Sequence, residues 1–146
     1  MSLKRFINQK KPFIKMDDSS TVQDAIGIMI ERKKGAVIVL QDGDRLGGVF
    51  TERDVMTKIV AEGRDPAKTA LRDVMTKDVV RLPETSSLDH AIKIMSKNGI
   101  RHLPVEDQNH NIIGMISLRH LLHEKVDMVI EELNAVDAYH NDSLGG

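Results

Sequence analysis

The chain has 146 residues, of which 40% are hydrophobic and only 3% aromatic, so an aliphatic core can form in one domain or in two small halves. Its 21 basic and 22 acidic residues nearly balance, which disfavours a nucleic-acid-binding protein because such proteins usually carry a basic surplus. Cysteine is absent, which excludes disulfides, thiolate metal sites and a cysteine nucleophile. No apolar run approaches about 20 residues, and the N-terminus lacks the apolar core of a signal peptide, so we expect a soluble cytoplasmic protein.

The first elements predicted along the chain are a lead-in, a short strand and a helix. Residues 1–13 form a basic lead-in with a short helix expected up to Gln9, and residues 14–16 suit a strand. Ser20 and Gln23 match a capping box, which predicts a helix start. The helix then shows one apolar face at helical spacing, made of Val22, Ala25, Ile26, Met29 and Ile30.

A β-hairpin and a second helix follow. Residues 36–40 and 46–50 are short apolar runs separated by an Asp42-Gly43 turn, a pattern typical of a hairpin. The next helix is predicted from Thr51 to about Ala61, with an inward face of Val55, Met56, Ile59 and Val60.

The same order of elements returns in the second half. A strand is predicted at residues 79–82, a hairpin over 100–105 and 112–116, and a final helix from Ser117. Between the first strand and the hairpin, Ser86 opens a helix whose inward residues are Leu88, Ala91, Ile92 and Met95.

These two halves are an internal duplication. Adding 66 to each number from 14 to 56 superposes them without a gap, and apolar character is kept at nearly every inward position. Thr51 falls on Ser117, and several positions carry identical residues: Ala25, Ile26, Ile28, Met29, Val39, Gly48 and Arg53 fall on Ala91, Ile92, Ile94, Met95, Val105, Gly114 and Arg119.

The duplication predicts an α/β (α+β) fold of two β-α-β-β-α repeats. Each repeat is too small to bury both faces of its hairpin, so the two should pack about a pseudo-twofold axis with a cleft on either side. The expected organisation is a lead-in (1–13), repeat 1 (14–63), a connector (64–73), repeat 2 (74–123) and a C-terminal helix and tail (124–146).

The stretch from Gly48 to Asp54 is the strongest candidate for a binding site. A strand runs into a hydroxyl at Thr51, and a carboxylate follows three residues later in the first turn of a helix. Free backbone N–H groups, a hydroxyl and an acid at a helix N-terminus could dock a sugar-phosphate. The same Thr-x-x-Asp pattern is also a helix cap, and both interpretations can hold together.

At this point the chain resembles tandem CBS domains, the pair known as a Bateman module. The resemblance covers residues 14–123 and rests on the Gly-φ-φ-Thr/Ser-x-x-Asp hairpin ends, on the run Gly99 to Val105 (Gly-Ile-Arg-His-Leu-Pro-Val), and on Val74-Met75-Thr76 before the second repeat. It implies clefts that bind adenosine compounds such as AMP, ADP, ATP, S-adenosylmethionine or NAD, and a pair that commonly dimerises into a flat disc.

The resemblance also implies a main nucleotide site. Asp54 would accept hydrogen bonds from the ribose hydroxyls, which suits a carboxylate because it accepts two O–H donors. Thr51 would contact ribose or phosphate. Arginine offers a planar fork of donors to an anion, and the residues facing the phosphates would be Arg53, Arg101 and His102. The adenine slot would be lined by Thr76, Val79, Val80 and Pro104.

The second cleft departs from the family pattern. His120 stands where the acid belongs, and a neutral imidazole accepts at most one ribose hydroxyl while a protonated one accepts none. We therefore expect a degraded or phosphate-preferring site at Ser117, Arg119 and His120, with Lys15 and Ala36 as its neighbours.

Neither a metal site nor an enzyme is expected. His120 and His123 lie three residues apart on a helix, but a zinc site needs further ligands at defined spacing. The sequence has no Ser-His-Asp order, no paired catalytic acids and no phosphate-binding loop of the Walker or dinucleotide type.

The C-terminal segment continues the last helix beyond the repeat. Its apolar stripe needs a partner surface on its own domain, on another protein or, as we favour, on a second copy: the stripe comprises Val126, Val129, Ile130, Leu133 and Val136. Residues 141–146 are predicted to be a frayed tail.

Two functions from different classes remain in view. The first is a stand-alone regulatory module that binds an adenosine nucleotide (AMP, ADP, ATP or NAD) and transmits its bound state to a partner protein or an oligomer. The second is a scaffold or dimerisation protein whose nucleotide clefts are vestigial. Intact Thr51, Arg53 and Asp54 favour the first function, and His120 favours the second.

Overall fold

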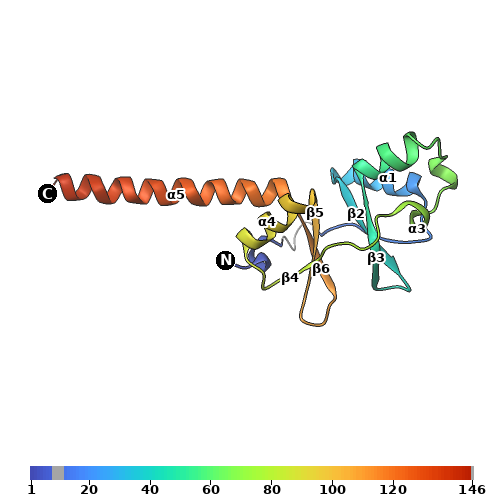
Figure 1. Ribbon diagram of the computed structural model, residues 1–146, viewed down its shortest axis with the longest axis horizontal. Helices are drawn as coiled ribbons and strands as arrows, with labels where there is room; N and C mark the ends of the chain where they lie inside the picture. The colour runs from blue at the N-terminus through green and yellow to red at the C-terminus, as the bar shows by residue number, and fades with distance from the viewer. Residues whose placement is uncertain (8–11, 146) are drawn as a thin grey trace.

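A computed structural model describes residues 1–7 and 12–145. Two halves lie side by side, each built on a three-stranded sheet, and one long helix extends away from the second half (Figure 1). The elements in chain order are η1 (Leu3–Phe6), β1 (Lys15–Asp17), α1 (Val22–Arg32), β2 (Ala36–Gln41), β3 (Arg45–Thr51), α2 (Glu52–Asp54), η2 (Val55–Val60), η3 (Pro66–Lys68), α3 (Leu71–Val74), β4 (Leu82–Pro83), α4 (Leu88–Asn98), β5 (His102–Glu106), β6 (Ile112–Ser117) and α5 (Leu118–Gly145).

The predicted duplication is confirmed in the strand register. In each half the first strand pairs in parallel with the second, and the second pairs antiparallel with the third. Ala36 lies opposite Thr51 in the first hairpin, and His102 lies opposite Ser117 in the second. Both hairpins shift register immediately after the equivalent valines, Val39 and Val105, so even the irregularity is repeated.

The two equivalent helices begin one residue later than the sequence predicted. Thr21 and Ser87 are the N-caps, and their side chains accept hydrogen bonds from the backbone N–H groups of Asp24 and His90. Both caps have extended backbone, as an N-cap requires, and the helices therefore start after them. The predicted starts at Ser20 and Ser86 are wrong by one position, because a second hydroxyl residue follows each of them.

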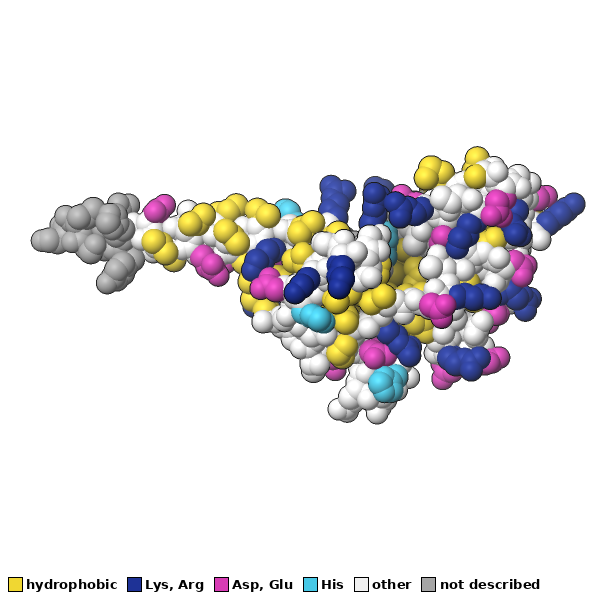
Figure 2. Space-filling view, in the orientation of Figure 1, with side chains coloured by type: hydrophobic (Ala, Val, Ile, Leu, Met, Phe, Trp, Pro, Cys, Tyr) yellow, Lys and Arg dark blue, Asp and Glu magenta, His cyan; other side chains and the backbone are white. Residues whose placement is uncertain are grey.

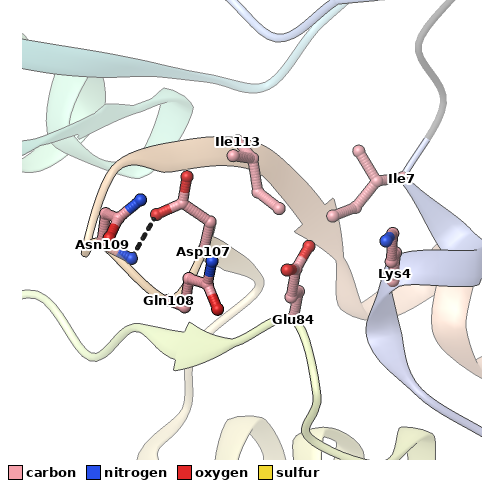
Figure 3. A pocket seen from close by; sticks show the side chains of 7 residues that line it. All are labelled: Lys4, Ile7, Glu84, Asp107, Gln108, Asn109 and Ile113. Carbon is pink, nitrogen blue, oxygen red and sulfur yellow. Dashed lines mark hydrogen bonds between the residues drawn. The ribbon is translucent and has the colours of Figure 1, made fainter.

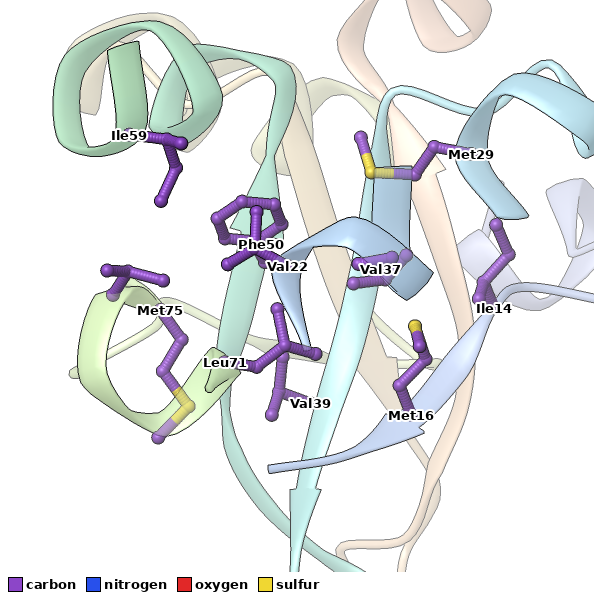
Figure 4. Packing of buried hydrophobic residues seen from close by; sticks show 12 residues of the cluster. Ile14, Met16, Val22, Met29, Val37, Val39, Phe50, Ile59, Leu71 and Met75 are labelled. Atoms are coloured by element: carbon purple, nitrogen blue, oxygen red, sulfur yellow. The ribbon is translucent and has the colours of Figure 1, made fainter. Parts of the chain in front are cut away.

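Each half has its own apolar core. In the first half, side chains from α1, β2, β3 and α3 converge on Phe50, which is fully buried, as Figure 4 shows. The second core packs around the fully buried Met95, Leu103 and Leu121. Burying side chains of this size contributes about 1.5–3 kcal/mol each.

A third cluster joins the halves, and we call it the interface cluster. Its members come from both hairpins and from the chain before β1 and β4: Phe13, Ala36, Ile38, Leu40, Leu46, Val49, Val79, Ile112 and Met115. The hairpin faces that a single repeat would expose therefore cover each other, which is the packing expected for the pseudo-twofold pair.

The segment that completes each half comes from outside that half. The Leu71 N–H donates to the Ser20 carbonyl at 2.9 Å, so the connector closes the first half. The Leu3 N–H donates to the Ser86 carbonyl at 2.9 Å, so the start of the chain closes the second half. Leu3 and Leu71 are both fully buried. The lead-in thus has a structural role that its basic composition did not indicate.

The helix after Thr51 differs from its prediction. After α2 it continues as the π-helical segment η2, in which the Ala61 N–H donates to the Met56 carbonyl five residues back. Ile59 is buried, but Met56 and Val60 are 61% and 72% exposed, so their predicted inward orientation is wrong. Each follows, by one residue, a side chain that packs in the first core, Val55 or Ile59. Ile30 is exposed in the same way on α1.

Three other element boundaries differ from the predicted ones. The strand expected at residues 79–82 is reduced to β4, and η1 ends at Phe6, while the predicted end at Gln9 lies outside the described residues. Helix α5 continues to Gly145, so the tail predicted from residue 141 is helical over its described part.

None of the helices in the described part of the chain is long and apolar enough to cross a membrane.

Candidate functional site

The start of α2 is held by a reciprocal cap between Thr51 and Asp54. The Thr51 hydroxyl accepts a hydrogen bond from the Asp54 N–H at 3.3 Å, and the Asp54 carboxylate accepts from the Thr51 N–H at 2.9 Å. The capping-box interpretation of this motif is therefore confirmed. Thr51 ends β3, so the sheet fixes the position of the cap and of the acid.

Asp54 is a buried acid whose oxygens already have partners. Its residue is only 4% exposed. The Thr76 hydroxyl lies 3.1 Å from Oδ1 and the Lys58 ammonium 3.2 Å from the same oxygen, while the Thr51 N–H and hydroxyl bond to Oδ2. Because a carboxylate offers about four acceptor positions, a ligand can reach Asp54 only by displacing one of these groups.

Lys58 belongs to this network, and the sequence analysis missed it. Its ammonium donates to the Val74 carbonyl at 2.9 Å and to the Thr76 hydroxyl at 3.3 Å, besides pairing with Asp54. The only sequence signal was its place four residues after an acid, which is a common helical pair. Lys58 connects the first repeat to the segment that leads into the second.

That segment also pairs with β3. The N–H groups of Val49 and Thr76 each donate to the other's carbonyl, at 3.1 and 2.9 Å. Gly48 makes the approach possible, since a Cβ placed on it would lie 2.5 Å from the Thr76 carbonyl oxygen. Thr76 is therefore held beside Asp54 by backbone as well as by side-chain contacts.

His102 enters the same region from the second repeat. A Cβ placed on Gly35 would lie 2.8 Å from Glu52 Oε1 and 3.2 Å from the His102 ring, so these three residues meet where α2 begins. Burial lowers the pKa of His102, Glu52 acts against that shift, and Arg101 adds to it. Glu52 and Gly35 were not among the predicted site residues.

The other predicted residues of the main site are more dispersed. Arg53 and Arg101 are exposed, as their proposed contact with phosphates requires. Val79 belongs to the interface cluster, whereas Val80 packs against the core of the second half. Pro104 is buried on β5 opposite Met115. The structure thus joins Thr51, Asp54 and Thr76 directly and places His102 at the start of the same helix.

The equivalent position in the second repeat has no buried acid. The Ser117 hydroxyl accepts from the His120 N–H at 3.1 Å, but the His120 side chain is exposed, and so is Arg119. Lys15 is also exposed, with its ammonium 5.6 Å from the centre of the Phe13 ring. Ala36 is only 1% exposed within the interface cluster, so it offers a ligand almost no surface.

The surface has two cavities, and one of them borders the start of α2. One of about 370 Å³ is lined by Glu84 and Asp107 among others, and these carboxylates face a space near Lys4 and Ile7 (Figure 3). The second, of about 490 Å³, lies between α1 and the start of α2. Asp54 lines neither of them. Among the described residues, no group of three His, Asp or Glu side chains could hold a metal ion.

Comparison with known proteins gives consistent results. The family model of the CBS domain matches residues 7–61 and 71–127. A mitochondrial CBS domain-containing protein of Arabidopsis thaliana is 36% identical over 124 residues, and an uncharacterized protein of Methanopyrus kandleri is 34% identical over 94 residues. These alignments cover 82% and 64% of this chain, but the chain spans only 59% and 48% of the two relatives.

Solved structures show the same fold. A protein with CBS domains from Burkholderia ambifaria superposes with a TM-score of 0.73 at 33% identity, covering 80% of this chain and 83% of that one. A CBS domain protein from Pyrobaculum aerophilum complexed with AMP superposes with a TM-score of 0.74 at 19% identity, covering 82% and 89% of the two chains. At that identity the second likeness establishes the fold alone.

Proposed function

Because the chain belongs to the CBS-domain family, we propose that its two repeats form a regulatory module that binds an adenosine nucleotide at the start of α2. The observation that carries the proposal is Asp54, a buried acid held at a helix start where the second repeat contributes Thr76 and His102. The ligand class is AMP, ADP, ATP or NAD, and AMP is the ligand of the P. aerophilum protein of the same fold.

Binding would exchange partners on Asp54. Two ribose hydroxyls would replace the Thr76 hydroxyl and the Lys58 ammonium on Oδ1, while the bonds from Thr51 to Oδ2 remain. The exchange is favourable only if the displaced groups find new partners, because a buried polar group without one is costly. The released ammonium would turn toward solvent, since the Lys58 side chain is already 33% exposed, and the phosphates would lie beside Arg53, Arg101 and His102.

The same exchange would transmit the bound state. Lys58 and Thr76 tie the first repeat to the segment leading into the second, so their release changes how the repeats are joined. A ligand shifts an equilibrium between two arrangements only by its difference in affinity for them. The proposed difference is access to Asp54, which is closed in the arrangement described here. A regulated partner protein or a change in oligomeric state would respond to this difference in access to Asp54.

The second cleft is proposed as a weak, phosphate-preferring site. Ser117, Arg119 and His120 offer a hydroxyl and two basic side chains, but no carboxylate for a ribose. One good nucleotide site per chain is therefore expected.

The test is a thermal-shift panel on the purified chain with AMP, ADP, ATP, NAD, NADH and S-adenosylmethionine, against guanosine nucleotides. A ligand at 100 times its Kd adds about 2.7 kcal/mol of apparent stability. An adenosine-selective rise that disappears in Asp54→Ala and persists in His120→Ala supports the proposal. No rise with any adenosine compound, or an equal rise in Asp54→Ala, overturns it.

A scaffold is the second candidate function, and the exposed apolar stripe of α5 favours it. A chain whose Asp54 network never opens would use its repeats only to present that helix. We propose a homodimer under either function. A regulatory rather than catalytic role and a cytoplasmic location remain predictions.

A further inference from the structure

Helix α5 carries an exposed apolar seam along the part that projects from the second half. The side chains recur at alternating steps of four and three residues, which is the spacing of a coiled-coil seam. All are substantially exposed, and Figure 2 shows apolar side chains along the helix. The seam consists of Leu122 (44% exposed), Val126 (55%), Val129 (40%), Leu133 (59%) and Val136 (64%).

A different face of α5 packs against its own chain. Leu121 is fully buried, Met128 packs against the second core, and the Lys125 ammonium lies 3.0 Å from Asp89 on α4. These residues mark the side of α5 that faces α4. In the described part of the chain the seam therefore remains uncovered, while the helix that bears it is anchored.

The charges beside the seam distinguish the two possible orientations of a paired helix. Lys125 and Glu132 flank one side, and Ile130 and Asp137 flank the other. In a parallel pair each flank meets the opposite flank of the partner about five residues further along, which sets Glu132 against Asp137. In an antiparallel pair like flanks meet, which avoids this repulsion. Lys125 would leave the exposed Asp89 of its own chain for Glu132 of the second copy, and the contact occurs twice.

We propose that α5 pairs with α5 of a second copy of this chain in an antiparallel coiled coil, with Val126 facing Val129 and Leu122 facing Leu133 across the seam. This register places both Lys125–Glu132 contacts beside the buried seam. The inference deepens the homodimer proposed above and is independent of the nucleotide site, because no seam residue contacts the Asp54 network.

Disulfide trapping on the 146-residue chain tests the orientation, since its sequence contains no cysteine. Val126→Cys and Val129→Cys proteins are oxidised separately and as a mixture. The antiparallel pair gives a mixed disulfide between the two proteins and little dimer from either alone. A parallel pair gives the reverse pattern and overturns the proposal. Glu131→Cys, on the opposite face of the helix, reports random collision and should give little dimer.

Light scattering on Leu133→Glu tests whether the seam forms a dimer at all, separately from the orientation of the two helices. Wild type is expected at twice the chain mass and Leu133→Glu at the chain mass, or with a dimer Kd at least about tenfold weaker. A monomeric wild type, or a dimer unaffected by Leu133→Glu, overturns the proposal that two copies pair through the seam. The nucleotide thermal-shift panel is repeated on Leu133→Glu: a retained shift shows that failure of the dimer and failure of the nucleotide proposal are separate results.

Discussion

The two repeats have the same backbone and different chemistry at equivalent helix starts. In the first, Thr51 caps a helix whose buried acid, Asp54, pairs with Lys58 four residues later. In the second, Ser117 caps a helix with His120 at the acid's position and Glu124 at the lysine's, so the acidic and the basic residue exchange places. The strand register that positions both sites is nevertheless identical.

The difference shows which features the fold itself requires. Apolar positions are kept in both repeats because each sheet must be covered, and a hydroxyl cap is kept because each helix start needs one. A buried carboxylate with a lysine is not required by the fold, since the second repeat folds without it. The pair at Asp54 is therefore better explained by function than by architecture.

The largest expected contrast is between Asp54→Ala and His120→Ala. Removing the buried acid leaves the Thr51 N–H and the Lys58 ammonium without their acceptor, so we expect a loss of about 2–4 kcal/mol in the free energy of unfolding. His120 is exposed, and its removal should cost about 0.5 kcal/mol or less. Urea unfolding measures both. Equal losses would mean that the two helix starts are energetically equivalent.

The glycine pair gives the next contrast. In Gly48→Ala the added methyl meets the Thr76 carbonyl oxygen at 2.5 Å, and backbone cannot easily move away. In Gly114→Ala it meets the Ile7 side chain at 2.9 Å, which can turn. Losses of about 2–3 and about 1 kcal/mol are expected in the same assay. If Gly114→Ala is the more damaging, the pairing of Val49 with Thr76 does not hold Asp54 as described.

Lys58→Met separates stability from nucleotide affinity. Losing the ammonium should lower the free energy of unfolding by about 1–2 kcal/mol, a modest value because the lysine side chain is 33% exposed. Since Lys58 competes with the ribose for Asp54, the nucleotide Kd should fall about three- to tenfold by calorimetry. A weaker Kd would instead identify Lys58 as a ligand contact. Glu124→Gln is the matched control and should change neither quantity.

The smallest expected effect is a pH dependence at His102. Burial holds the pKa of this imidazole below its ordinary value of 6.5. Between the two pKa values the unfolded chain therefore binds more protons than the folded chain. The contribution of the neutral His102 imidazole to the free energy of unfolding is fully present above about pH 6.5. It is lost as the pH falls toward the folded-state pKa. His102→Gln should flatten the change in urea midpoint between pH 7.5 and 5.5, whereas the exposed His90→Gln should not.

The duplication could be predicted because apolar residues recur at the same spacing in both halves, and this spacing is visible in the sequence alone. The site was partly predictable: the Thr51–Asp54 cap is local in sequence, but its hydrogen bond from Thr76 was not expected, because the family resemblance gave Thr76 only a place in the adenine slot. Lys58 was missed because its role depends on the carbonyl of Val74, sixteen residues away.

The errors have local physical causes. Ser20 precedes Thr21 and Ser86 precedes Ser87, and only backbone dihedral angles decide which hydroxyl caps the helix. Met56 and Val60 have the spacing of a buried face, but only the neighbouring face of η2 covers the core. Spacing alone does not reveal which of two adjacent apolar stripes meets the rest of the molecule.

The way each half is closed has a consequence for biosynthesis. The first repeat can be completed soon after its own residues are made, because its closing segment follows at Leu71. The second repeat takes its closing segment from Leu3, which is translated before either repeat and finds its partner only when Ser86 has been translated. Contacts so distant in sequence form slowly, so in a nascent chain the segment around Leu3 lacks its hydrogen-bond partner until the second repeat has been made.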